Sequence, residues 1–135
     1  MFVEFLAYYA DWAYLLLRVM FGLIFVTHGW PKLKSLKTNA NHFEAMGIKP
    51  GKFWGTIVAL VETVGGLALV VGLYTQVAAV LIAVDMLVSS IWKMKRGQGL
   101  VGGYELDLTL LLVALLFATI GAGVYSLDFY WFFGY

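Results

Sequence analysis

The stretch from Tyr14 to Lys32 is apolar apart from one arginine, Arg18, near its middle and one histidine, His28, near its end, and it stops at a Trp-Pro pair. A charged side chain at the centre of a lipid bilayer costs about 2.5 to 3.5 kcal/mol on insertion scales, so Arg18 should not face lipid. The rest of the chain must therefore offer Arg18 a polar partner. We expect that partner to be a carboxylate from another helix.

The composition places this stretch in a membrane protein. Of the 135 residues, 62% are hydrophobic and only 13% are charged, and the mean hydropathy is +0.87. About 20 apolar residues cross a bilayer as a helix, so this length has room for four spans. The absence of cysteine excludes disulfides and thiolate metal sites, and two histidines alone argue against a zinc site.

We therefore predict an all-α fold, a single polytopic membrane domain over residues 1–135 that forms an antiparallel bundle of four transmembrane helices. The hydrophobic segments place the helices at about 12–30, 53–73, 77–92 and 104–120. Pro31 predicts the end of the first helix, because proline disfavours helical geometry in the residue before it. A short interfacial helical turn is expected near residues 41–47, where an asparagine precedes and a glycine follows.

The basic residues predict the orientation of the bundle. Eight of the nine lysines and arginines lie in the segments 31–52 and 93–103, and the ninth is Arg18. The positive-inside rule puts both basic segments in the cytoplasm and both termini outside a cell membrane. The acidic, aromatic N-terminus does not resemble a cleavable signal peptide, so we expect the first helix to be retained.

The remaining ionisable residues of the helices fall in the same half of the bundle. At about 1.5 Å per residue from the cytoplasmic ends, His28 lies about 3 Å deep, Asp85 about 10 Å, Glu62 about 13 Å and Arg18 about 18 Å. Two further acids, Glu105 and Asp107, lie in the first turn of the last helix. We expect Arg18 to pair with Glu62 or Asp85, with Glu62 favoured.

One face of the first helix carries Arg18, Phe21, Phe25 and His28 at spacings of three, seven and ten residues. This spacing turns the arginine and the histidine inward, separated by aromatic rings. Phe25 could then form the floor of a pocket for a flat ligand. In the third helix, Asp85 and Ser89 share a face, and in the fourth Asp107 is rotated by about 200° from Glu105.

Each of these residues also has a purely structural interpretation. An ion pair between Arg18 and an acid can fix the register of helices without chemistry. Glu105 and Asp107 can simply interact favourably with the positive end of the helix dipole at the N-terminus of the last helix, and His28 can be an ordinary interfacial histidine. Together, however, an inward arginine, several acids and a histidine on four helices exceed what a scaffold needs.

Several sequence blocks, in this order, resemble the DoxX family. They cover residues 14–128 and read Arg18-x3-Gly22, His28-Gly29-x2-Lys32, Ala59-Leu-Val-Glu62-Thr-Val-Gly65-Gly66, Gly72-Leu-Tyr-Thr75, Tyr104-Glu-Leu-Asp107-Leu and Gly121-x-Gly123-x2-Ser126-Leu-Asp128. The resemblance implies a four-helix membrane protein. The family pattern includes Arg18, His28, Glu62, Glu105 and Asp107, whereas the role of Asp85 depends on the burial argument alone.

The family includes relatives of the membrane subunits of thiosulfate:quinone oxidoreductase, which implies a redox role linked to the quinone pool. In this hypothesis His28, Glu62 and Glu105 exchange protons, and Arg18, His28, Phe25, Glu62, Asp85 and Asp107 form the site for a quinone. Electrons would come from a partner protein, because we find no ligand set for a haem, a flavin, an iron-sulfur cluster or another metal. The hypothesis leaves open whether the chain itself is an enzyme.

Two other classes of function compete with this one. The buried acids could couple protons to the transport of a small solute, or the chain could be a non-catalytic scaffold or assembly factor. Small residues on the helix faces also make a homo-oligomer reasonable. The composition gives no sign of nucleic-acid binding.

Overall fold

The computed structural model describes residues 1–134, which are helical with short connections and contain no strand. Four helices are long and apolar enough to cross a membrane once the irregular turn Leu100–Tyr104 is counted with the last. They are α2 (Ala10–Lys34), α4 (Gly51–Val71), α5 (Thr75–Lys95) and α6 (Glu105–Ile120). The predicted all-α fold with four membrane-spanning helices is confirmed.

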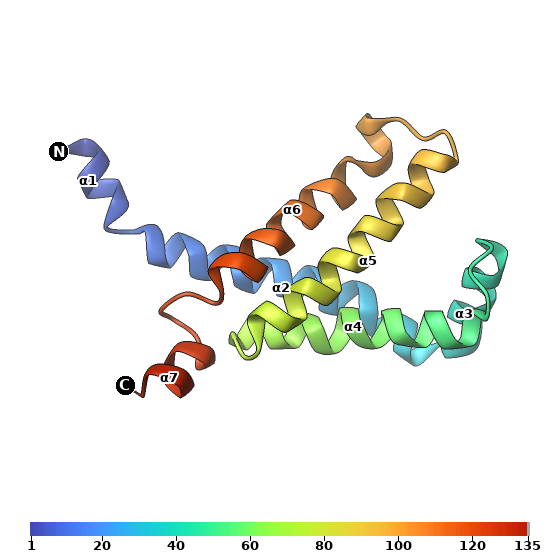
Figure 1. Cartoon of the computed structure of the whole chain (residues 1–135), viewed down its shortest axis with the longest axis horizontal. Helices are drawn as coiled ribbons and strands as arrows, with labels where there is room; N and C mark the ends of the chain where they lie inside the picture. The colour runs from blue at the N-terminus through green and yellow to red at the C-terminus, as the bar shows by residue number, and fades with distance from the viewer. Residues whose placement is uncertain (135) are drawn as a thin grey trace.

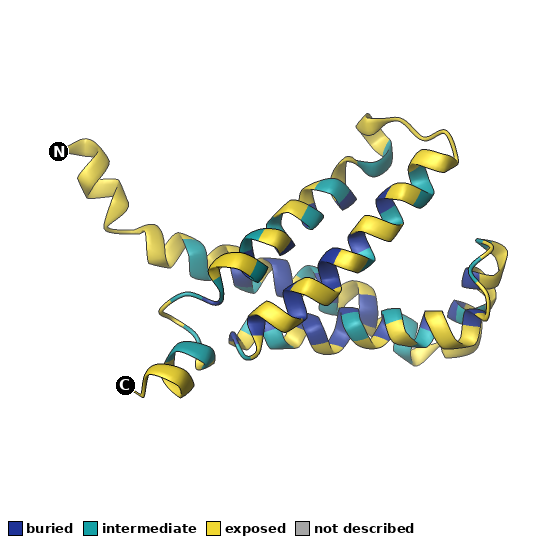
Figure 2. Cartoon of the chain, in the orientation of Figure 1, coloured by how far each residue is buried: buried dark blue, intermediate teal, exposed yellow. Residues whose placement is uncertain are grey.

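Three shorter helices lie at the ends of these spans. Helix α1 (Phe2–Ala7) projects from the start of α2 and is exposed along its whole length (Figures 1 and 2). Helix α3 (Leu36–Ala45) packs on the first half of α4, and α7 (Leu127–Phe133) lies near the turn between α4 and α5. The short helix expected near residues 41–47 exists, but it begins at Leu36, directly after the break at Ser35.

The bundle has two distinct ends. We call the end with the start of α2, the α4–α5 turn and the segment after α6 the aromatic end. The opposite end, with α3 and the turn between α5 and α6, is the basic end.

The four long helices form two antiparallel pairs, α2 with α4 and α5 with α6, which cross at an angle (Figure 1). In the first pair the backbones touch: a Cβ atom added at Gly22 would lie 2.5 Å from the carbonyl oxygen of Gly66. Gly29 approaches Glu62 and Thr63 as closely. Glycine spacing of this kind permits the close packing that holds membrane helices together.

A core of aromatic and small side chains joins the two pairs. Phe21 of α2 packs against Phe117 of α6 with ring centroids 5.4 Å apart, and Leu69, Ile82 and Ala114 fill the space around them. Figure 2 shows that the buried residues follow the inward faces of the long helices. The outward faces stay apolar, as lipid contact requires.

The sequence predicted that the first long helix ends before Pro31, but it does not. It continues to Lys34, and the amide of Ser35 donates to the carbonyl of Pro31 at 3.2 Å. Proline inside a membrane helix costs one backbone hydrogen bond, which neighbouring groups can compensate. The extra turn puts Lys32 on the helix, and similarly α5 runs past Trp92 to include Lys93.

Candidate functional site

Arg18 is buried, with 2% of its surface exposed, but it does not pair with a carboxylate. Its Nε donates to the carbonyl of Leu69 at 2.9 Å, its Nη1 to that of Ala122, and its Nη2 to that of Tyr125 at 2.8 Å. The prediction that Arg18 pairs with Glu62 or Asp85 is therefore wrong. The physical reason is that the carbonyls of Ala122 and Tyr125 lie in the non-helical segment after α6 and that of Leu69 lies in the last turn of α4, so these three acceptors satisfy the guanidinium fork without an acid.

The segment after α6 closes the aromatic end through further polar contacts. The hydroxyl of Tyr14 donates to the carbonyl of Gly121 at 2.6 Å. The carboxylate of Asp128 accepts from the backbone amides of Tyr74 at 2.6 Å and Thr75 at 2.9 Å, and so caps the N-terminus of α5. Arg18 thus belongs to a structural clamp that joins α2, α4 and the segment 121–128.

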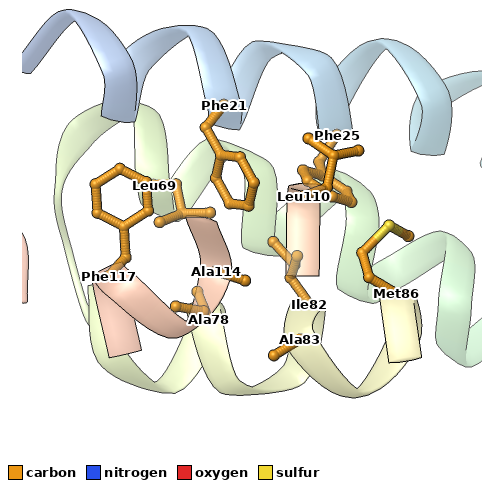
Figure 3. Close-up of a cluster of buried hydrophobic side chains, with 11 residues drawn as sticks. Phe21, Phe25, Leu69, Ala78, Ile82, Ala83, Met86, Leu110, Ala114 and Phe117 are labelled. Carbon is orange, nitrogen blue, oxygen red and sulfur yellow. The ribbon is translucent and has the colours of Figure 1, made fainter. Parts of the chain in front are cut away.

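Phe25 and His28 do not form a ligand slot with Arg18. Phe25 is 2% exposed and its ring packs edge to face on Phe21, with centroids 4.9 Å apart, inside the core shown in Figure 3. His28 is exposed. Ten residues at 100° each leave His28 about 80° from Arg18, whereas Gly29 and Lys32 lie within about 40° of the Arg18 line. The inward face therefore continues to Lys32 and not to His28.

Glu62 is buried beside the end of α2. It is 4% exposed, and the Lys32 ammonium lies 2.9 Å from its Oε1 and 2.8 Å from its Oε2. The lysine reaches this acid because Gly29, one turn earlier, lets α2 approach α4 at Glu62. The side chain of Lys32 remains 32% exposed, so the buried acid is connected to the surface through its partner.

Asp107 is the second buried acid, with 7% of its surface exposed. Its Oδ2 accepts from the Ser89 hydroxyl at 2.8 Å and lies 2.7 Å from the Lys93 ammonium. Both partners come from α5, so these contacts join α5 to the start of α6. The side chain of Lys93 is 29% exposed.

Asp85 lies between these two ion pairs on α5. Its carboxyl is close enough to those of Glu62 and Asp107 for their charges to interact. Its Oδ2, like the Oε2 of Glu62, is buried with no hydrogen-bond partner among residues 1–134. We call Glu62, Asp85 and Asp107, with Lys32, Ser89 and Lys93, the carboxylate cluster.

Glu105 does not join the carboxylate cluster. It is exposed, and its Oε1 accepts from the amide of Gly102 at 3.2 Å, which steadies the turn before α6. The rotation between Glu105 and Asp107 was predicted correctly, and it turns Asp107 inward. The two acids have different surroundings because only Asp107 faces α5.

The sequence interpretation missed Lys32 and Lys93 as members of the site. Both were treated as loop residues, because each long helix was expected to end before them. The helical face offers the signal that would have found them: Lys32 lies three residues after Gly29, and Lys93 follows Asp85 and Ser89 at intervals of four.

A separate groove of about 580 Å³ opens at the aromatic end, between the start of α5, the segment after α6 and α7. Its walls include Phe129, Phe132 and Phe133. Thr75 also lines it, and the Thr75 hydroxyl oxygen is buried without a hydrogen-bond partner in the described chain. No residue of the carboxylate cluster lines this groove, since the cluster extends from the middle of α4 and α5 to the first turn of α6.

Chemically, the carboxylate cluster can hold and release protons. It joins three acids from three helices to two lysines that reach the surface, and acidic groups inside membrane bundles form proton relays in pumps and transporters. No set of three metal-binding side chains within residues 1–134 is arranged to hold a metal ion.

Four membrane-spanning helices around a buried carboxylate cluster define a multi-pass integral membrane protein. Comparison with known sequences shows that the chain belongs to the DoxX family, whose sequence pattern matches residues 13–94.

Three relatives cover most of the chain. It is 32% identical to "Putative oxidoreductase CatD" of Bacillus subtilis, over 84% of this chain and 83% of the relative. It is also 32% identical to "Inner membrane protein YqjF" of Escherichia coli, over 87% of this chain and 91% of the relative. Identity to "Uncharacterized membrane protein Rv3486" of Mycobacterium tuberculosis is 28%, over 83% and 77%. No solved structure matches the chain.

Proposed function

We propose that this protein is the membrane subunit of an oxidoreductase linked to the quinone pool, and that the carboxylate cluster exchanges protons for that reaction. The observation that carries the proposal is that two buried acids, Glu62 and Asp107, and the buried Oδ2 of Asp85 come together from three helices. Ionisable groups inside membrane bundles characteristically mark proton pathways. The name of the relative CatD, which contains the word oxidoreductase, supports the redox part.

The orientation of the protein follows from its basic residues. Eight of the nine lysines and arginines lie in the segments 31–52 and 93–103, which belong to the basic end. We infer that this end faces the cytoplasm of a cell membrane and that both termini lie outside. The name of the relative YqjF, an inner membrane protein, agrees with the membrane part of this inference.

The residues expected to hold a quinone ring do not fit one. Phe25 is packed within the core, His28 is exposed, and the guanidinium of Arg18 is already bonded to three carbonyls. The groove at the aromatic end fits better, because it combines phenyl rings with the unpartnered hydroxyl of Thr75. There Thr75 would donate to a carbonyl oxygen and Phe129 would contact the ring. A bound quinone supplies an acceptor for electrons and protons.

The groups of the chain itself would act in the carboxylate cluster, away from the groove. Lys32 and Lys93, about one third exposed, connect the buried acids to the solvent. Asp85 and Glu62 would take up and give up the proton, and Asp107 pairs with Lys93. Electrons would be delivered by a partner protein.

A binding experiment tests the quinone part. The purified full chain is titrated with decylubiquinone, and quenching of its tryptophan fluorescence is followed. We expect saturable binding that weakens about tenfold in Thr75→Val, because one hydrogen bond contributes about 1 to 1.5 kcal/mol. Thr119→Val is the matched control, since Thr119 is exposed and its hydroxyl bonds only to its own helix. Linear, non-saturating quenching in the wild type would contradict quinone binding.

Proton-coupled transport of a small solute is the second candidate. It is favoured by the separation of the carboxylate cluster from the groove, which none of the cluster residues lines, since a proton site that drives transport needs no contact with a redox ligand. Proteoliposomes with an internal pH dye distinguish the two functions. Proton flux that depends on an added solute and needs no quinone would favour transport.

A further inference from the structure

We propose that the carboxyl groups of Glu62 and Asp85 share one exchangeable proton, so that these two side chains form a proton-binding site inside the bundle. Glu62 belongs to α4 and Asp85 to α5. The two groups are close enough for their charges to interact, and the Oε2 of Glu62 and the Oδ2 of Asp85 are both buried without a hydrogen-bond partner among residues 1–134. Ionised carboxylates are acceptors only, so a contact between two of them lacks a donor unless one carries a proton.

The surroundings of Glu62 leave room for that donor. Glu62 is 4% exposed, and its Oε2 has the Lys32 ammonium 2.8 Å away but receives no hydrogen bond of good geometry. One lone pair of a buried carboxyl oxygen is therefore open. The neutral carboxyl of Asp85 supplies the hydrogen that such an oxygen requires.

The balance of charges in the carboxylate cluster also indicates that one of its acids carries a proton. Lys32 is occupied by Glu62, and Lys93 by Asp107 at 2.7 Å. Asp85 forms no ion pair with any lysine or arginine of the described residues, and its Oδ2 is buried. Three acids with two cations leave one negative charge unbalanced, and two carboxylates at close range cannot both stay ionised in an apolar site.

The other charged groups around the pair are few. Lys32 faces it from α2, Lys93 lies on its own helix α5, and Asp107 faces it from α6. His28 and Glu105 are exposed and stand outside the cluster. The proton therefore belongs to Glu62 and Asp85, since every other ionisable group nearby is already paired or in contact with solvent.

A role for the shared proton in the reaction rests on the proposed function. The presence of the proton does not, because infrared spectroscopy detects a protonated carboxyl in the resting protein. Failure of quinone binding would leave the infrared result untouched. Failure of the infrared result would leave quinone binding untouched.

The test is infrared spectroscopy of the full chain in dodecyl maltoside, a detergent without ester carbonyls. We expect one carboxylic C=O band at neutral pH that shifts in D2O. Asp85→Asn should remove it, because Glu62 then pairs with Lys32 alone. Glu62→Gln should also remove it, because Asp85 then has Lys32 as a free counter-ion. Lys32→Met should roughly double its area, because two adjacent carboxyls then lack a cation.

Glu105→Gln is the control, because this acid is exposed and should leave the band unchanged. A second measurement covers the case in which a variant folds poorly. Asn is close in shape to a neutral aspartic acid, so Asp85→Asn should unfold at the wild-type temperature, whereas Asp107→Asn should unfold earlier because Lys93 loses its partner. A wild-type spectrum without the band, or a band that persists in both single variants, overturns the proposal.

Discussion

Replacement of Arg18 by methionine should open the aromatic end of the bundle. Methionine keeps the length of the side chain and removes all three donors. The carbonyl of Leu69 retains the amide of Gly72 at 3.2 Å, but those of Ala122 and Tyr125 lose the guanidinium. An orphaned buried carbonyl costs about 1 to 3 kcal/mol, and the contact to Tyr125 is only partly buried. We therefore expect a loss of about 3 kcal/mol, or about 100-fold in the unfolding equilibrium.

The loss is measured by unfolding the purified protein with increasing sodium dodecyl sulfate in dodecyl maltoside micelles, followed by far-ultraviolet circular dichroism. Arg18→Lys is the informative companion. A lysine keeps the charge but has no planar guanidinium, so its ammonium can donate to only some of the three carbonyls. We expect it to recover about half of the lost stability, about 1.5 kcal/mol.

A double-mutant cycle separates the carbonyl clamp from an ion pair with Glu62. If Arg18 and Glu62 do not touch, the effects of Arg18→Met and Glu62→Gln should add to within about 0.5 kcal/mol. A larger coupling would refute the assignment of Arg18 to the clamp. So would an Arg18→Met protein that is within about 1 kcal/mol of the wild type, since one buried and one partly buried carbonyl left without a donor cost more than that together.

Three further changes test other parts of the structure. Gly66→Ala should destabilise the protein by about 1 to 3 kcal/mol in the same detergent titration, because its Cβ would lie 2.7 Å from a backbone oxygen of α2. Gly65→Ala is the control and should be near neutral, because its Cβ would meet no atom nearer than 3.4 Å. Asp128→Ala should cost about 1 kcal/mol through the lost cap of α5, visible as faster hydrogen exchange in the first turn of that helix. Lys93→Met should lower the unfolding temperature, because the buried carboxylate of Asp107 loses its cation. Adding Asp107→Asn should recover part of that loss, and an equal deficit in the single and the double variant would refute the ion pair.

The arrangement of four membrane helices was predictable from the sequence because it depends on long-range hydropathy. Lipid offers backbone groups no partners, so apolar segments of about 20 residues have few alternatives to a helix. The helix ends were less predictable. Pro31 was interpreted as a stop signal, yet the helix continues to Lys34 and ends only at Ser35.

The partners of the buried charges could not be deduced from depth alone. The depth estimate assumed that all helices start level at the basic end. In the structure the first turns of α4 pack on α3, where Asn39 donates to the carbonyl of Gly55 at 2.8 Å. Glu62 is therefore level with Gly29 and Lys32, and not with Arg18. Such offsets arise from tertiary packing, which a single sequence does not reveal.

The glycine contacts between α2 and α4 also determine which parts can move. Backbones that touch at Gly22 and Gly66 leave no side chains to slide, so α2 and α4 form one rigid body. Helices α5 and α6 form the second body. Glu62 and Asp85 face each other across the boundary, so a shared proton attracts the two bodies, and its loss makes them repel. The spacing of the two helix pairs at the basic end is thus expected to follow the protonation of a single site.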